Sequence, residues 1–292
     1  MASPDTPFTP PLYSKGYWHR VGKRLKEDKI TLFVLGLLTT LIILAVLAPL
    51  FTPYDPYTGS VMLRLKSIGT PGHWLGTDEV GRDLWTRMIY GGRLSLLAGI
   101  LPVFLALVIG GFLGMLAGFV GGLLNSLIMR VTDILYAFPS ILLAIAITGL
   151  LGSGIVNTII ALTVSFIPPI IRMSESITAQ IRHLDFVDAA RASGASSLAI
   201  IRYHVLNNIL GPILVYTTSL ISLSIILAAG LSFLGLGVTP PNAEWGLMLN
   251  NMRQAIWTAP LVAALPGVMI FLTSMSFNLL SDGLRQAMDV RL

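Results

Sequence analysis

The sequence predicts an all-α integral membrane protein with six transmembrane helices. Only 11% of the 292 residues are charged, whereas a soluble domain has about 25%. Hydrophobic residues make up 54% of the chain, and the mean hydropathy is +0.79. Several charge-free runs exceed the roughly 20 apolar residues that cross a bilayer as a helix. These observations exclude a soluble globular protein.

The charge-free runs place the helices in order. A segment of aromatic and basic residues at 17–26 suits a short helix lying at the inner headgroup level. The first span that follows is longer than the apolar part of a secretory signal and lacks a cleavage pattern, so we expect an uncleaved anchor. A glycine-rich turn at 149–154 divides the third run into two spans. The expected spans are 30–51, 94–119, 136–152, 155–173, 210–235 and 258–281.

The distribution of Lys and Arg predicts the orientation, because cytoplasmic segments carry an excess of both. With the N-terminus inside, 13 of the 19 basic residues fall on inner segments. We therefore expect both termini and residues 174–206 in the cytoplasm, and residues 54–92 and 236–256 outside. The chain then divides into a cytoplasmic N-terminal segment (1–29), an anchor helix (30–51), an external loop (52–93), a five-span core (94–281) with a cytoplasmic loop at 184–208, and a cytoplasmic tail (282–292).

Composition also excludes several kinds of site. The chain has no cysteine, which rules out disulfides, a thiol nucleophile and cysteine-ligated metals. Its four histidines lie in separate segments without paired ligand spacing, so we expect no metal site. Basic residues are scattered between apolar segments, and nucleic acid is therefore not an expected partner.

Energy coupling within this chain is also disfavoured. No lysine follows a glycine run as in a phosphate-binding loop, so any ATP that drives the protein must bind another subunit. The expected spans hold essentially no ionisable side chains, which ion-driven carriers, proton relays and intramembrane enzymes require. An ion-coupled secondary transporter or channel remains the alternative to a transporter driven by ATP that another subunit binds.

The second span carries a ridge of small residues. Residues four apart lie along one face of a helix, and small ones let two backbones approach closely in lipid. The partner of this face is either another span of the same chain or a second subunit. The ridge consists of Ala106, Gly110, Gly114, Gly118 and Gly122.

The cytoplasmic loop at 184–208 is rich in small residues. Asp185 or Asp188 can cap a short helix that continues through alanines, and Gly194 permits a left-handed exit into a second helical segment. The small face of such a helix fits a groove on another protein. An ordinary surface hairpin between two spans is the competing interpretation.

Three motifs resemble those of ABC importer permeases. The run Asp-Ala-Ala-Arg-Ala-Ser-Gly at 188–194 is similar to the loop of these permeases that begins Glu-Ala-Ala and has a glycine four residues after the second alanine. Asp188, His204 and Asn207 depart from that pattern, which has Glu, Ile and Pro there. Two further runs, 76–83 and 234–249, resemble the peptide/nickel branch, in the subunit type with one anchor helix before a five-span core.

The resemblance implies a type I permease fold and a set of partners. It implies a second homologous permease, two ATPase subunits that bind ATP and Mg, and an extracytoplasmic substrate-binding protein, with this chain in the inner membrane of a prokaryote. The residues that match the coupling motif and its neighbours are Asp188, Ala189, Ala190, Arg191, Gly194 and Ala195.

The resemblance also singles out two outer segments. The first contains Gly76, Thr77, Asp78, Gly81, Arg82 and Asp83, for which a helix start with a Glu79–Arg82 pair competes with direct substrate contact. The second contains Pro240, Pro241, Glu244 and Trp245, where we expect the tryptophan to be an interfacial anchor beside a rigid turn, with a docking surface or outer gate as the alternative.

Overall fold

A computed structural model describes residues 16–288, and every regular element in that range is helical, as the sequence predicts. Lys15 and Arg291, both counted in the orientation argument, lie outside the described residues. Five helical segments are long and apolar enough to cross a membrane. They are α2 (Lys29–Val46), α4 (Leu84–Val120), α7 (Ile155–Ile181), the segment Ser197–Phe233 and α12 (Pro260–Met288).

The predicted span at 136–152 corresponds to part of a bent pair of helices. The helices α5 (Gly122–Tyr136) and α6 (Ser140–Leu151) together pass the same test but are bent by 85°. Pro139 lies at the break, where it lacks an N–H to continue a helical ladder and forms the N-cap of α6. The single span expected at 136–152 is therefore wrong, because residues 122–136 are helical and not a connecting loop.

Other helix ends also differ from the expected ones. The helix α4 begins at Leu84 and not at residue 94, and α7 and α12 continue to Ile181 and Met288. The charge-free criterion finds the part of a helix that lies in hydrocarbon, whereas hydrogen bonding continues through the charged turns beyond it. The glycine-rich turn at 149–154 is confirmed, since α6 ends at Leu151 and α7 begins at Ile155.

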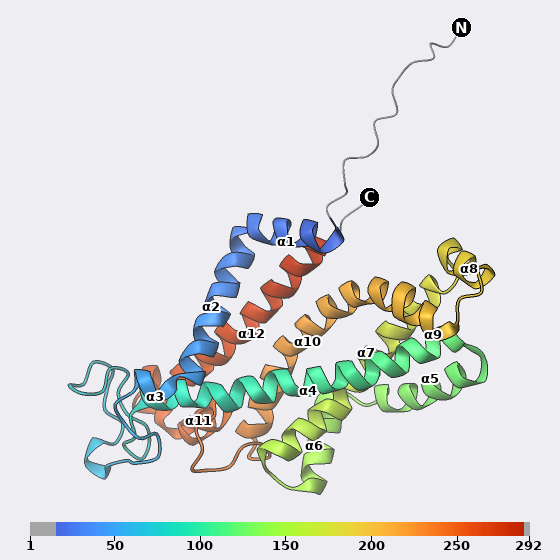
Figure 1. Cartoon of the computed structure of the whole chain (residues 1–292). Coiled ribbons are helices and arrows are strands. Elements are labelled where there is room, and N and C mark those ends of the chain that lie inside the picture. Colours follow the sequence, from blue (N-terminus) through green and yellow to red (C-terminus); the bar gives the residue numbers. More distant parts are fainter. Residues whose placement is uncertain (1–15, 289–292) are drawn as a thin grey trace, which may run out of the picture.

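The shorter elements lie at the two ends of the molecule (Figure 1). The loop between α3 and α4 and the helix α11 occupy one end, and α8 lies at the other. The helix α1 packs against α2 and α12. Their bounds are α1 (Tyr17–Glu27), α3 (Ala48–Phe51), α8 (Asp185–Ala192), α11 (Trp245–Asn251) and two short 3-10 turns at Val61–Leu63 and Arg253–Trp257.

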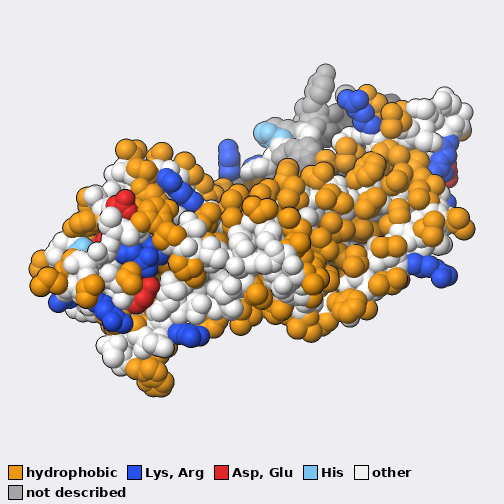
Figure 2. Space-filling model, turned by 90° about the horizontal axis from the view of Figure 1, so that it is seen from below, with side chains coloured by type: hydrophobic (Ala, Val, Ile, Leu, Met, Phe, Trp, Pro, Cys, Tyr) orange, Lys and Arg blue, Asp and Glu red, His pale blue; other side chains and the backbone are white. Residues whose placement is uncertain are grey.

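The segment Ser197–Phe233 joins α8 to the core without interruption. It begins with α9 (Ser197–Ile200), continues through a π-helical turn (Ile201–Val205) and ends as α10 (Leu206–Phe233). Figure 2 shows hydrophobic side chains over the middle of the surface and Lys and Arg gathered toward both ends. This distribution is typical of a membrane protein whose middle zone lies in lipid and whose two ends lie in water.

The ridge of small residues packs against α7 of the same chain. A Cβ atom added at Gly110, Gly114 or Gly118 would lie 3.0, 2.4 or 2.6 Å from a backbone oxygen of α7. Ala106 is fully buried on the same face. Gly122 is not part of the ridge, because it opens α5 and an added Cβ would meet no atom within 4 Å. The ridge therefore joins two helices of this chain.

Candidate functional site

The helix α8 is the short helix that the sequence predicts in the loop after α7. Its N-cap is Leu184, and no side chain caps it. The expectation that Asp185 or Asp188 is the cap is therefore wrong, and both carboxylates lie in the first turn. Negative charge is favourable there because the helix dipole is positive at its N-terminus. Asp188 pairs with Arg191 at 2.9 Å.

Gly194 ends α8 in the left-handed conformation that the sequence predicts. Its φ is +82°, which glycine adopts without the steric cost of a Cβ. The Gly194 N–H donates to the Arg191 carbonyl at 3.0 Å, and the Ala195 N–H donates to the Ala190 carbonyl at 3.1 Å. These are the two bonds of a Schellman motif. The chain then turns into α9, whose N-cap is Ser196.

One side of α8 is fixed to the body of the protein and the other is bare. Val187 is fully buried in a cluster with side chains from α4, α7 and α10, and Ala190 packs at the edge of that cluster. An added Cβ at Gly194 would meet no atom within 4 Å. The exposed residues are Asp188, Ala189, Arg191, Gly194 and Ala195. The result is a small helical face on a rigid base, which suits contact with a groove on another protein.

The first outer segment builds the start of α4. Asp83 is the N-cap and accepts hydrogen bonds from the Thr86 N–H at 2.8 Å and the Thr86 hydroxyl at 2.7 Å. His73 Nδ1 lies 2.8 Å from the other Asp83 oxygen. The turn before Asp83 leaves no room for a side chain at either of its two glycines. A Cβ at Gly76 or Gly81 would lie within 2.2 Å of a backbone oxygen. The helix start expected here is confirmed.

Charged side chains of this segment are paired with one another. Arg82 Nη2 lies 2.9 Å from Glu79, as expected, and Arg82 Nε lies 2.6 Å from Asp78. Asp78, Arg82, Asp83 and Thr77 are all buried. Burial also raises the pKa of Glu79. These pairs hold the outer loop together, while Glu79 and Arg82 also line a cavity with Pro240, Pro241 and Asn242.

Arg87 is a functional residue that the sequence analysis missed. It is almost fully buried, and its Nη1 donates to the Pro56 carbonyl at 2.7 Å. Its Nη2 donates to the Asn242 carbonyl at 3.2 Å, and its Nε lies 3.2 Å from Asp78. The guanidinium therefore joins α4 to the outer loop and to the segment before α11. Periodicity gave no signal for this role, since Arg87 was placed in a loop.

The second outer segment is more buried than the sequence predicts. Trp245 has 1% of its surface exposed, and its Nε1 donates to the Met88 carbonyl at 2.8 Å. The interfacial-anchor interpretation of Trp245 is therefore wrong. The turn before it contains Pro240 and Pro241, joined by a cis peptide bond.

Glu244 caps α11 from a buried position. Its carboxylate accepts hydrogen bonds from the N–H groups of Gly246 and Leu247 at 2.9 and 2.8 Å, and from the Ser95 hydroxyl at 3.0 Å. Burial raises the pKa of Glu244, although the two backbone N–H donors act in the opposite direction. Through Ser95 this side chain ties α11 to α4.

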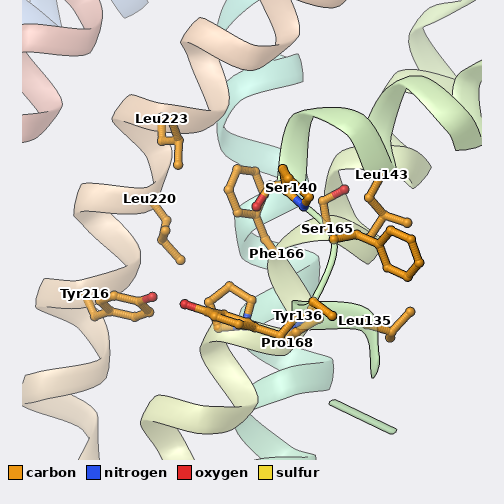
Figure 3. A pocket seen from close by; sticks show the side chains of 14 residues that line it. Leu135, Tyr136, Ser140, Leu143, Ser165, Phe166, Pro168, Tyr216, Leu220 and Leu223 are labelled. Carbon is orange, nitrogen blue, oxygen red and sulfur yellow. The ribbon is translucent and has the colours of Figure 1, made fainter. Parts of the chain in front are cut away.

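A cavity of about 390 Å³ lies where α5 breaks into α6. Its walls come from the break itself, from α7 around Pro168 and Pro169, and from α10. Figure 3 shows the hydroxyls of Tyr136 and Tyr216 pointing toward one another across it. Irregular backbone at membrane depth is tolerated where it lines a cavity, and broken helices form substrate sites in transporters. Its volume is that of a small-molecule site.

Ionisable residues do occur in the helices around this cavity. Asp133 of α5 and Arg172 of α7 form an ion pair, and the Arg172 guanidinium lies 4.9 Å from the centre of the Tyr136 ring. Glu175 accepts a hydrogen bond from Asn125 at 2.6 Å. The predicted span 155–173 holds Arg172 near its end, whereas Asp133 and Glu175 lie outside the predicted spans, in α5 and in the part of α7 that continues past residue 173.

Sequence signals for the cavity were present but weak. Pro139 follows Tyr136 by three residues, and Pro168 and Pro169 interrupt an otherwise apolar run. Proline in a span indicates local backbone irregularity, yet it does not say which helices meet there. Tyr216 lies about 80 residues from Tyr136 in the sequence, so only the fold brings them together. Within residues 16–288 no group of three or more His, Asp or Glu side chains could hold a metal ion.

Comparisons with known families agree with this architecture. Residues 110–292 match a family described as the binding-protein-dependent transport system inner membrane component. Residues 16–67 match the N-terminal transmembrane domain of oligopeptide transport permease C.

Several relatives match over nearly the whole chain. The glutathione transport system permease protein GsiD of Pectobacterium atrosepticum is 42% identical over 276 residues, which are 94% of this chain and 90% of that protein. GsiD of Escherichia coli O6:K15:H31 is 41% identical over 292 residues, 100% of this chain and 94% of that protein. The dipeptide transport system permease protein DppC of Alkalihalophilus pseudofirmus is 41% identical over 275 residues, 94% and 90% of the two chains.

Solved structures share the fold. A chain of the inward-facing MetNI methionine ABC transporter superposes with a TM-score of 0.58 at 20% identity, over 71% of this chain and 98% of that one. A chain of an amino acid ABC transporter gives a TM-score of 0.52 at 17% identity, over 68% and 94%. Since the family model covers more than half of the chain and relatives above 40% identity span it, this multi-pass membrane protein belongs to the binding-protein-dependent transport system inner membrane components, the permease subunits of ABC importers.

Proposed function

We propose that this permease, with a second homologous permease, forms the pathway by which small peptides cross the inner membrane of a prokaryotic cell. The names of its relatives support the substrate class, since they describe glutathione and dipeptide transport. The cavity at the α5–α6 break supports it as well, because its walls combine tyrosine and serine hydroxyls with apolar side chains. Such walls suit a molecule with both amide groups and apolar side chains.

ATP and Mg²⁺ bind to two partner ATPase subunits, and α8 receives the resulting movement. The observation that carries this proposal is the exposed face of α8 on a buried base, with Gly194 open to contact. A ligand shifts a conformational equilibrium only when it interacts differently with the two states. The ATPase groove must therefore hold α8 differently when the two ATPase subunits open and close. This chain itself carries no catalytic residues in the proposal.

An extracytoplasmic binding protein delivers the peptide at the opposite end. There the side chains of Glu79 and Arg82, together with Pro240, Pro241 and Asn242, line a cavity of about 300 Å³. Glu244 and Trp245 are buried below this surface and hold it in place. In this arrangement the α8 end and both termini are cytoplasmic, and the loop before α4 is external.

An ion-coupled transporter or channel is the alternative function. The Asp133–Arg172 pair is the feature that such a mechanism could use. Its two charges neutralise one another, which leaves neither free to carry a proton or bind an ion.

Purification of the intact complex from its native membrane, through a tag on this chain, tests the proposal. We expect two ATPase subunits and a second permease in the complex. In proteoliposomes, ATP hydrolysis should rise when the binding protein is added together with glutathione or the dipeptide dialanine. Recovery of this chain without ATPase subunits, or hydrolysis that neither peptide stimulates, would contradict the proposed function.

A further inference from the structure

Two charged side chains in the membrane-spanning region face one another beside the cavity. Asp133 and Arg172 form an ion pair between α5 and α7, and their side chains are 56% and 49% exposed in the single chain. An exposed surface ion pair adds little stability, so stability alone does not account for this one.

The pair lies outside the cavity lining, one helical turn from it on α5 and on α7. Asp133 precedes Tyr136 by one helical turn on α5, and Arg172 follows Pro168 and Pro169 by one turn on α7. The Arg172 guanidinium lies 4.9 Å from the centre of the Tyr136 ring, within the range of a cation–π contact. Tyr136 therefore touches both the cavity and the ion pair. The two charges therefore lie next to a residue of the cavity wall.

We propose that Asp133 and Arg172 exchange their mutual ion pair for the two charged termini of a peptide in transit. The peptide ammonium binds Asp133, and the peptide carboxylate binds Arg172, whose planar guanidinium suits bidentate contact. Tyr136 keeps the guanidinium in place during this exchange. The inference rests on the proposed peptide transport and adds which residues read the termini.

The free-energy cost of separating Asp133 from Arg172 makes the pair selective for solutes that carry both charges. Where water is limited, separating the two charges leaves each without a partner, and this is unfavourable unless both find new ones. A peptide with both termini free offers an ammonium and a carboxylate and can replace both partners. A solute with only one charge would leave either Asp133 or Arg172 unpaired. The closed pair therefore rejects such a solute by the cost of opening, which is specificity by exclusion.

Two other roles make different predictions. The pair could only fasten α5 to α7, or it could only contact the second permease. Both are structural roles, and both depend on the presence of two opposite charges and not on which helix carries which charge. The proposal includes a fixed orientation of the peptide in the pathway, so the proposed role depends on which helix carries which charge. Exchanging the two residues separates these possibilities.

The experiment uses the complete complex in proteoliposomes with its binding protein and the peptide that stimulates ATP hydrolysis. Four variants are compared with the wild type: Asp133→Asn, Arg172→Gln, the double neutral variant and the exchanged pair Asp133→Arg with Arg172→Asp. Peptide uptake, peptide-stimulated ATP hydrolysis, complex yield and thermal unfolding are measured for each. Neutralising the exposed Lys23–Glu27 pair of α1, which is distant from the cavity, is the matched control.

We expect the double neutral variant to assemble and unfold as the wild type does, with uptake reduced at least about tenfold, as for loss of charged hydrogen bonds. Stimulated ATP hydrolysis should persist, because α8 is unchanged. The exchanged pair should restore stability to any single variant that loses it, but not uptake. Wild-type uptake in the double neutral variant, or recovery of uptake with the exchanged pair, would overturn the inference. Failure of peptide to stimulate the wild-type complex would instead contradict the proposed function.

Discussion

At Gly194 one residue sets both the backbone turn after α8 and the open space beside it. A side chain there would incur roughly 1 kcal/mol or more for the left-handed conformation, and it would also hold α8 away from a bound partner. We expect Gly194→Val to reduce peptide-stimulated ATP hydrolysis about tenfold, a loss of coupling free energy within the usual 1–3 kcal/mol. Measurement in proteoliposomes, with pull-down of the ATPase subunits, checks this expectation.

Gly152 provides the matched control for that substitution. It also has a positive φ, +89°, and an added Cβ would meet no atom within 4 Å, but it ends α6. Gly152→Val should have a backbone cost at least as large, because its ψ of 169° places it in a region that essentially only glycine adopts, and it should leave coupling intact. If Gly194→Val binds ATPase subunits and transports as the wild type does, α8 is an ordinary surface hairpin and not a coupling helix.

Asp188 should contribute less than the sequence suggested. An N-cap is worth about 1 kcal/mol, but Asp188 lies in the first turn and pairs with an exposed Arg191. We expect Asp188→Ala to change the stability of the complex by less than about 1 kcal/mol, as is typical of exposed pairs and of first-turn carboxylates. Thermal unfolding of the purified complex checks the size. A much larger loss of ATPase binding than of stability would place Asp188 in the interface itself.

Glu244 predicts a pH dependence of stability. Its pKa in the folded protein is raised above the ordinary value of 4.5, so the folded state holds this proton more tightly than the unfolded state does. The protonated form therefore adds stability that is fully present below pH 4.5 and is lost as pH rises through the folded pKa. Thermal unfolding of the wild type and of Glu244→Gln, measured from below pH 4.5 to above the folded pKa, should show the wild type losing stability relative to the variant as pH rises. A difference that is constant with pH would show that Glu244 does not titrate in this range.

Among the helices, the contact between α4 and α7 depends most directly on small residues. A Cβ at Gly114 would lie 2.4 Å from the Ile171 carbonyl oxygen, so Gly114→Leu must push the two backbones apart. Overpacking of this kind costs about 1–3 kcal/mol, and we expect lower yield and lower thermal stability of the complex. Gly111→Leu is the control, because an added Cβ there lies 3.6 Å from a single flexible side chain, Leu107. Equal yields for the two variants would mean that the ridge does not determine packing.

The helices show how far the sequence alone leads. Hydrophobic runs predicted the number of spans, because crossing a bilayer requires apolar length regardless of what each helix contacts. The same runs gave wrong ends for α4, α7 and α12, where helical hydrogen bonding continues past the apolar region. At α5 the charged residues suggested a loop, although Asp133 and Asn125 have partners on α7. Partners of this kind are tertiary and leave no local pattern.

Site residues could likewise be predicted where their structure depends on neighbours in sequence, but not where it depends on tertiary contacts. The left-handed turn at Gly194 was predictable because it depends on neighbours in sequence, and so was the helix start at Asp83. The burial of Trp245 was not, since it depends on contact with Met88 of α4, 157 residues away. Arg87 and the Tyr136–Tyr216 cavity were missed for the same reason.

For the whole molecule, the orientation in the membrane is directly testable because the chain contains no cysteine. Cysteine placed at Ser196, in the turn after α8, should resist an impermeant thiol reagent added outside intact cells. Cysteine at Met62, which is 88% exposed in the opposite loop, should react with it. Labelling after permeabilisation confirms that Ser196→Cys is reachable. Labelling of that position from outside without permeabilisation would reverse the topology.

The uninterrupted helical segment from α9 to α10 connects α8 directly to the wall of the cavity. Ser197, beside α8, and Tyr216, in the cavity wall, are 19 residues apart on this segment, at most about 28 Å at 1.5 Å per residue. A tilt of about 5° around the Ser197 end would displace Tyr216 by about 2.5 Å over that length. The π-helical turn at Ile201–Val205 lies within this length, and bending there would reduce the displacement that reaches Tyr216. We therefore expect a small displacement of α8 to change the separation of Tyr216 from Tyr136, so that the opening of the cavity depends on what α8 contacts.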